Sequence, residues 1–165
     1  MTRIGILSDT HLTRPDELFT ARVSACFAEI PVIIHAGDLT SPSVLEVFAG
    51  KEVYAVHGNM CDHSSRSTLP PCRKLAIDRF EIVVVHGYGF GYGNDLEERL
   101  FSEFTSADCI IYGHTHSPVC HTVGEVLIMN PGSFQSTGRF GSPGTYGVLT
   151  VGEKLCGRIH TVPEG

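Results

Sequence analysis

The sequence predicts one α/β domain, residues 1–165, built on mixed β-sheets. A chain of 165 residues has the size of one domain with a single substantial core. Short β-branched runs alternate with helical patterns in the first two thirds, and strand-like runs follow one another without helices from Pro118 onward. Parallel strands need long crossovers whereas antiparallel strands need only turns, so we expect both kinds of pairing.

The first half of the chain alternates strands with helices. The expected order is strand 3–7, helix 16–30, strand 32–35, helix 41–48 and strand 52–57. Pro42 suits the first turn of a helix that has Ser41 as its N-cap. A further helix is expected at 94–104, where Asn94 and Glu97 have the spacing of a capping pattern.

The second half adds two apolar strands and then four hairpin strands. Residues 81–85, after a turn at Asp78-Arg79, and residues 109–112 are apolar enough to be buried on both faces of a sheet. The late strands are expected at 119–123, 125–129, 145–151 and 155–162. We expect these four strands to pack together as a second sheet.

Charge and composition exclude several classes of partner. The formal net charge is −6, and the twelve basic residues are spread thinly, so neither polymeric nucleic acid nor an anionic membrane is expected as a partner. The apolar run at residues 4–7 is too short for a signal peptide or a membrane span, which predicts a cytoplasmic protein. Six scattered cysteines without a CxxC pair read as reduced thiols.

Five of the expected strands are each followed by a loop with polar residues that can bind metals. Ligands of open α/β sheets bind beyond the carboxyl ends of the strands, so the five loops can converge on one site. Nine histidines, an unusually large number for this length, supply several of these side chains. The candidate residues are Asp9, His11, Asp38, Asn59, His86, His114 and His116.

The spacing within these loops favours metal chelation. Asp9 and His11 are two residues apart, as are His114 and His116, which in an extended chain points both side chains to one side. Glycine beside each ligand removes bulk and allows sharp turns. Seven ligands exceed the need of one ion, and one carboxylate can bridge two ions about 3.5–4 Å apart. Two divalent ions, two carboxylates and a hydroxide leave about one positive charge for a phosphoryl anion.

The motifs SDTH, AGD, HGN, HG and GHTH, in this order and followed by NPGS at residues 130–133, resemble those of the calcineurin-like metallophosphoesterases. The resemblance spans nearly the whole chain and is greatest to small bacterial and archaeal members. It implies a four-layer α/β/β/α sandwich, with two mixed β-sheets flanked by helices.

The resemblance also implies the roles of the seven residues. Asp38, Asn59 and His86 are implied at the reaction centre, with Asp38 as the bridge between the ions. One ion would be held by Asp9, His11, Asp38 and His116, and the other by Asp38, Asn59, His86 and His114. The mixed nitrogen and oxygen set suits Mn²⁺, our expectation, or the alternatives Ni²⁺, Fe²⁺ and Zn²⁺. A hydroxide bridging the ions would attack phosphorus in line in a small phosphodiester, or in a phosphomonoester with a good leaving group.

The sequence departs from the family at one position. Larger members carry a histidine directly after the GN of HGN, and this chain has Met60 there. Asp62 and His63 lie close enough in sequence to replace it, although solvated loop side chains are commoner. Arg14 and Arg139 are candidates for binding the substrate phosphate, and the alternative for each is an ordinary surface arginine.

Two further expectations concern partners and neighbouring residues. The family also contains a trafficking scaffold with a degenerate site, so a catalytically weak or inactive scaffold that acts through protein partners is the alternative function. Edge strands of the late hairpins predict a homodimer. His35 and His57 precede ligand loops and are expected to orient ligands. Tyr88, Phe90 and Tyr92, which are separated by glycines, either line the substrate entrance or pack a loop.

Overall fold

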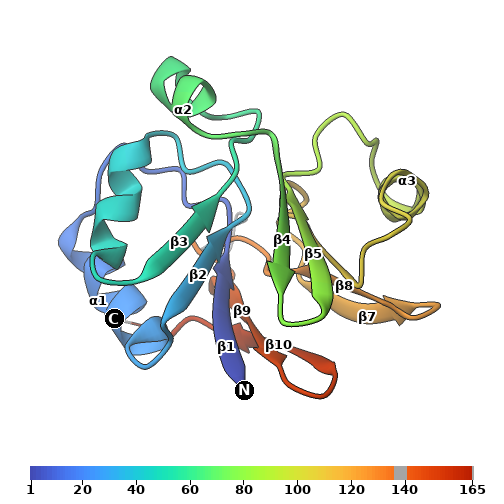
Figure 1. Cartoon of the computed structure of the whole chain (residues 1–165). Helices are drawn as coiled ribbons and strands as arrows, with labels where there is room; N and C mark the ends of the chain where they lie inside the picture. Colours follow the sequence, from blue (N-terminus) through green and yellow to red (C-terminus); the bar gives the residue numbers. More distant parts are fainter. Residues whose placement is uncertain (136–140, 165) are drawn as a thin grey trace.

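The protein, described by a computed structural model over residues 1–135 and 141–164, consists of two five-stranded sheets packed face to face (Figure 1). The first sheet has the order β10-β9-β1-β2-β3, comprising β10 (Leu155–Thr161), β9 (Thr145–Val151), β1 (Thr2–Leu7), β2 (Val32–His35) and β3 (Glu52–Ala55). The second has the order β4-β5-β6-β8-β7, comprising β4 (Cys72–Ile77), β5 (Phe80–Val85), β6 (Cys109–Ile111), β8 (Val126–Asn130) and β7 (Val119–Val123).

Both sheets are mixed, as the sequence predicted. In the first sheet β1, β2 and β3 are parallel, while β9 pairs antiparallel with both β1 and β10. In the second sheet β5, β6 and β8 are parallel, and the hairpins put β4 and β7 antiparallel on the two edges. The parallel strands β1, β2, β3, β5 and β6 are followed by the loops that contain the candidate ligands.

Helices cover the outer face of each sheet. The helix α1 (Glu17–Phe27) and the 3-10 helix η1 (Pro42–Phe48) lie against the first sheet, and α3 (Asn94–Glu103) lies against the second (Figure 1). The Asp16 side chain caps α1 by accepting a hydrogen bond from the Phe19 N–H at 2.7 Å. A third core lies between the sheets, where Ile6 and Ile34 meet Val84 and Ile111. The predicted four-layer α/β/β/α sandwich is confirmed.

Several local predictions were wrong. The four late strands do not form the second sheet: β7 and β8 join β5 and β6, whereas β9 and β10 extend the first sheet beside β1. Each hairpin is set by its own turn, but the sheet that it joins depends on pairing with strands distant in sequence. The strands β7 and β10 each lie at the edge of a sheet, where a second subunit could pair. The homodimer stays a prediction.

Two elements were not predicted, and one of the two predicted N-caps is wrong: Ser41 is the N-cap of its helix as expected, whereas Asn94 is not an N-cap. A short polar helix α2 (His63–Thr68) and the edge strand β4 lie between β3 and β5. The segment after Ser41 is a 3-10 helix, and Ser41 makes no side-chain capping bond. The N-cap of α3 is Gly93, so Asn94 is already the first helical residue. Within the described residues, the helices are too short or too polar to cross a bilayer.

Candidate metal centre

The loops after β1, β2, β3, β5 and β6 meet at one end of the sandwich, between the two sheets. The Asp9 N–H donates to the Gly37 carbonyl at 2.9 Å, which joins the loop after β1 to the loop after β2. The Gly113 N–H donates to the His86 carbonyl, also at 2.9 Å, which joins the loops after β6 and β5. These bonds bring the candidate ligands together.

Asp9 is buried, and its two carboxylate oxygens have different surroundings. Oδ2 accepts hydrogen bonds from the Ser8 hydroxyl at 2.6 Å and from the His114 N–H at 3.2 Å. Oδ1 lies 3.2 Å from His116 Nε2 and 3.8 Å from His11 Nε2. The contact with Asp9 raises the pKa of His116. One oxygen therefore fixes the carboxylate and leaves the other directed at two imidazoles.

Asp38 and His86 form the second part of the cluster. Asp38 Oδ1 accepts the Met60 N–H at 2.7 Å, and its Oδ2 lies 3.1 Å from His86 Nε2. The other ring nitrogen of His86, Nδ1, lies 2.8 Å from the Ala36 carbonyl and must carry the proton that this bond needs. Burial opposes the charged form of His86, but Asp38 and Asp9 outweigh it and raise its pKa. Burial likewise opposes ionisation of Asp38, and His86 more than compensates, so the pKa of Asp38 is lowered.

The structure groups the ligands in two overlapping sets. Asp9, His11 and His116 make one set with ligand atoms within 4.8 Å of one another, and Asp9, Asp38 and His86 make the other. The role of Asp38 as the bridge between two ions stays a prediction, because the residue that both sets share is Asp9. The reason is that Asp9 Oδ1 lies only 3.9 Å from His86 Nε2 as well as near the other two histidines.

Asn59 and His114 lie beside these sets. Asn59 follows Gly58, whose Cα directly faces the Asp38 carboxylate. The backbone carbonyl of Asn59 accepts a hydrogen bond from the Arg66 guanidinium at 2.7 Å. The His114 ring is 5.2 Å from the His86 ring, centroid to centroid, and half-buried. All seven predicted residues therefore lie in the loops around the cluster.

Three buried polar atoms in this cluster make no hydrogen bond of acceptable geometry among the described residues, although Asp9 Oδ1 and His86 Nε2 each lie within 3.2 Å of another candidate ligand. They are Asp9 Oδ1, Asn59 Oδ1 and His86 Nε2. Leaving such atoms unpaired costs about 1–3 kcal/mol each, so native proteins rarely do it without a reason. A carboxylate oxygen, an amide oxygen and an imidazole nitrogen are all cation ligands, and the residues therefore fit a divalent metal.

Backbone strain is also concentrated at the candidate ligands. Five of the seven have positive φ in the left-handed region, with values of 55° for Asp9, 49° for His11, 57° for Asp38, 69° for His114 and 60° for His116. Non-glycine residues are held in this region at about 1–3 kcal/mol each, and such strain clusters at functional sites. The sharp turns aim several side chains into the small space between the sheets.

A network around the NPGS turn positions the ligand loops, a role that was not predicted from the sequence. Asn130 Nδ2 donates to the Gly113 carbonyl at 3.0 Å and to the Thr115 hydroxyl at 2.9 Å. The Ser133 hydroxyl donates to the Asp9 carbonyl at 3.1 Å. The turn thus joins the loop after β1 to the loop after β6. The signal in the sequence was a polar turn directly after a buried apolar strand.

His35 orients the loops rather than facing the cluster. Its Nδ1 accepts the Gly37 N–H at 3.2 Å, so its Nε2 carries the proton and donates to the Thr10 hydroxyl at 3.1 Å. The ring is completely buried. Burial, the largest cause, lowers the pKa of His35 from 6.5 to about 4. His35 is therefore neutral in the folded protein at neutral pH.

Because His35 is buried and neutral, we expect the folded protein to lose stability as the pH falls. Its folded pKa lies below its unfolded pKa, so the unfolded chain binds the extra proton and the stabilisation is lost progressively as pH falls from about 6.5 to about 4. The loss amounts to roughly 3 kcal/mol over that range. We expect the metal-free His35→Gln protein to show a shallower fall of Tm between pH 7 and pH 4.5 than the metal-free native protein. Parallel curves would contradict this account.

The other residues that the sequence suggested for the site have different surroundings. Met60 is 60% exposed, and its N–H is used by Asp38. Asp62 is the N-cap of α2, where its carboxylate accepts the Ser65 N–H at 2.7 Å. His63 is exposed at the start of α2, and Arg14 is exposed in the loop after His11. The prediction for Arg139 lies outside the described residues.

Of the aromatic residues between the glycines after His86, two lie at the cluster. The Tyr88 ring is 6.2 Å from the His86 ring, and the Tyr92 ring is 5.4 Å from the His114 ring. Both tyrosines are exposed. Phe90 instead packs at 6.2 Å against Phe104, behind α3. The tyrosines therefore form part of the rim of the site.

Comparison with known proteins agrees with this geometry. Residues 2–154 match the calcineurin-like phosphoesterase superfamily domain. The chain belongs to this superfamily. A probable metallophosphoesterase of Methanothermobacter thermautotrophicus is 34% identical over 157 residues, which are 94% of this chain and 90% of that protein.

Solved structures of this superfamily fold superpose over nearly the whole chain. An archaeal phosphodiesterase has a TM-score of 0.73 at 26% identity and covers 97% of this chain and 99% of its own. Vps29 of Entamoeba histolytica, solved with Zn²⁺, has a TM-score of 0.72 at 17% identity over 98% of this chain and 100% of its own, which shows a common fold. Relatives named phosphodiesterase and metallophosphoesterase place this phosphoesterase domain among hydrolases that use divalent metals.

Proposed function

We propose that the protein hydrolyses small phosphodiesters, or phosphomonoesters with good leaving groups, with two divalent metal ions bound by the seven candidate ligands. The observation that carries the proposal is the set of three buried ligand atoms on Asp9, Asn59 and His86 that make no hydrogen bond. A bound cation would satisfy a carboxylate oxygen, an amide oxygen and a lone-pair nitrogen in one place. The strained turns at five of the ligands support the same assignment.

In this proposal each residue has a role that follows from its surroundings. Asp9, His11 and His116 would hold one ion, Asn59, His86 and His114 would hold the other, and the Asp38 carboxylate would contribute to both. The Ala36 carbonyl keeps the proton of His86 on Nδ1 and thereby directs the Nε2 lone pair at the site. When bound, the ions supply an acidified water and stabilise charge on the phosphoryl oxygens. Mn²⁺ is our proposed metal, because the donors mix nitrogen with oxygen.

Neither Met60 nor Asp62 supplies a proton to the leaving group. Met60 has no proton to give from its side chain, and its N–H is bound to Asp38. Asp62 is engaged as a helix cap, so it does not replace the missing histidine. We therefore propose esters whose alcohol leaves readily as an anion, with Arg14 binding the phosphate from the exposed loop after His11.

Activity of metal-stripped protein tests this function. We expect hydrolysis of bis-p-nitrophenyl phosphate to appear when Mn²⁺ is added and to be weaker with Mg²⁺. Asp38→Asn is expected to lose at least about 100-fold in kcat/KM, because even neighbours of metal ligands are typically worth 10- to 100-fold. Glu29→Gln, an equivalent change at an exposed position near the end of α1, is the control. A folded protein that hydrolyses no ester with any of Mn²⁺, Ni²⁺, Fe²⁺ or Zn²⁺ would favour the scaffold alternative.

A further inference from the structure

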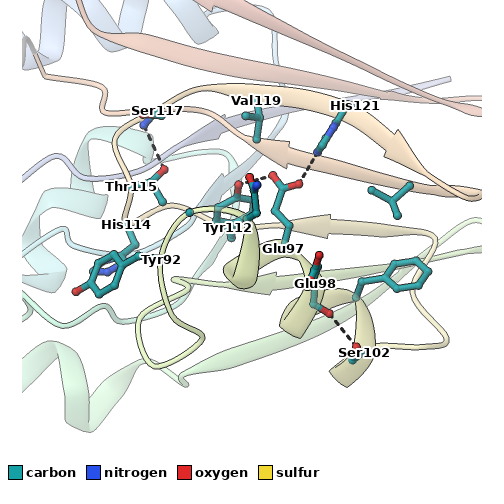
Figure 2. Close-up of a pocket in the computed structure, with 14 residues that line it drawn as sticks. Tyr92, Glu97, Glu98, Ser102, Tyr112, His114, Thr115, Ser117, Val119 and His121 are labelled. Carbon is teal, nitrogen blue, oxygen red and sulfur yellow. Dashed lines mark hydrogen bonds and ion pairs between the residues drawn. The ribbon is translucent and has the colours of Figure 1, made fainter.

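A groove of about 1060 Å³ opens beside the metal centre, between α3 and the β7–β8 hairpin. His114 and Tyr92 lie together at one end of it, and His121 lies toward the other end (Figure 2). His114 is a proposed metal ligand, so the groove is continuous with the site where the phosphate would bind. Its volume is that of a small-ligand pocket.

Apolar side chains make up much of its wall. Tyr92 is 77% exposed, Phe101 is 39% exposed and Val123 is 36% exposed, and all three line the groove. These are three of the seven large hydrophobic residues exposed in the described part of the chain. Large apolar side chains gathered in a concave surface favour a ligand that covers them.

Three polar side chains of the groove, Glu97, Tyr112 and His121, are bound to one another. The Glu97 carboxylate extends from α3 toward Tyr112 and His121 (Figure 2). Its Oε1 accepts the Tyr112 hydroxyl at 2.6 Å, and its Oε2 lies 2.6 Å from His121 Nε2. Glu97 is thus fixed by two partners and leaves the groove without a free base at its centre.

The charge of the groove is unfavourable for anions. Glu97 and Glu98 both line it, and among the lining residues that the structure describes there is no lysine or arginine. A second phosphate or a carboxylate in the groove would face these acids without a permanent cation. An uncharged ring would instead cover Phe101 and Tyr92 and bury apolar surface.

We propose that this groove binds one organic group of the phosphodiester, an uncharged aromatic group such as an aryl ring or a nucleobase, and selects against a second anion. The assignment rests on the proposed function of the adjacent metal centre. The expected substrates are diesters with one flat, uncharged substituent, rather than bisphosphates.

The test compares p-nitrophenyl phosphodiesters whose second group is methyl, phenyl or 4-carboxyphenyl, with the Mn²⁺-loaded native protein. We expect kcat/KM to be higher for phenyl than for methyl, and the carboxylate to remove this gain. Phe101→Ala should reduce the phenyl-to-methyl preference by roughly 3- to 10-fold, the size of an aromatic contact. Leu18→Ala, an exposed apolar residue on α1, is the matched control and should keep the native preference.

A charge variant gives an independent measurement. Glu98→Lys, at an exposed position of the groove, should raise kcat/KM of the 4-carboxyphenyl ester relative to the phenyl ester by roughly 5-fold at low salt. If both variants keep the native preferences while the native protein hydrolyses all three esters, the groove assignment is wrong and the proposed function stands. If the native protein hydrolyses none of them with any metal, the proposed function fails and the groove assignment falls with it.

Discussion

Replacing Asp9 with asparagine is expected to lower kcat/KM for bis-p-nitrophenyl phosphate by at least about 100-fold while leaving the metal-free protein folded. The amide oxygen of asparagine can take the place of Oδ2, which accepts bonds from Ser8 and the His114 N–H. The substitution removes the negative charge at Oδ1, which is the buried oxygen that makes no hydrogen bond. Activity depends on that charge, whereas the fold of the metal-free protein does not.

Two further measurements separate this result from simple unfolding. The Tm of the metal-free variant should lie within about 4 °C of the native value, roughly 1 kcal/mol for a chain of this size. The Asp9 carboxylate, 3.2 Å from His116 Nε2, raises the pKa of His116, so an NMR titration of metal-free protein should find a lower pKa for His116 in the variant. An unchanged His116 titration together with native activity would contradict the assigned geometry.

Adding one methyl group at Gly58 is expected to damage both the fold and the site. A Cβ there would lie 2.2 Å from Asp38 Oδ1 and 2.7 Å from the Asp38 backbone nitrogen, closer than atoms can approach. Because one of these is a backbone atom, the loop itself must move. We expect Gly58→Ala to lower Tm by about 5–10 °C, from overpacking of about 1–3 kcal/mol, and kcat/KM by about 100-fold.

Gly152→Ala provides the matched control. Neither glycine has a positive φ, and a Cβ at Gly152 would meet only Met1 Cγ at an ordinary 3.7 Å. Its Tm and activity should therefore stay at native values. Equal Tm and activity in the two variants would show that the loop of Gly58 is not packed against Asp38 as described.

The parts of this protein that are local in sequence could be predicted from it. The buried strands around Ile33, Val84 and Ile110 were evident because continuous apolar runs need no long-range information. The ligand loops were evident because each carries its residues directly after such a strand. The α2 and β4 segments were missed because α2 is polar, with only Ser65 buried, and β4 is an edge strand containing Arg73 and Lys74.

The order of motifs along the chain was sufficient to determine the family and the kinds of ligand atom that it offers. Only the tertiary structure decided which sheet each late hairpin joins, because β9 finds β1 across more than a hundred residues and local turns carry no information about that partner. It also decided that Asp9 Oδ1 faces three histidines, and that α3 and β7 enclose a groove beside them. Distances between side chains on different loops depend on how the two sheets pack, and no spacing in the sequence encodes that packing.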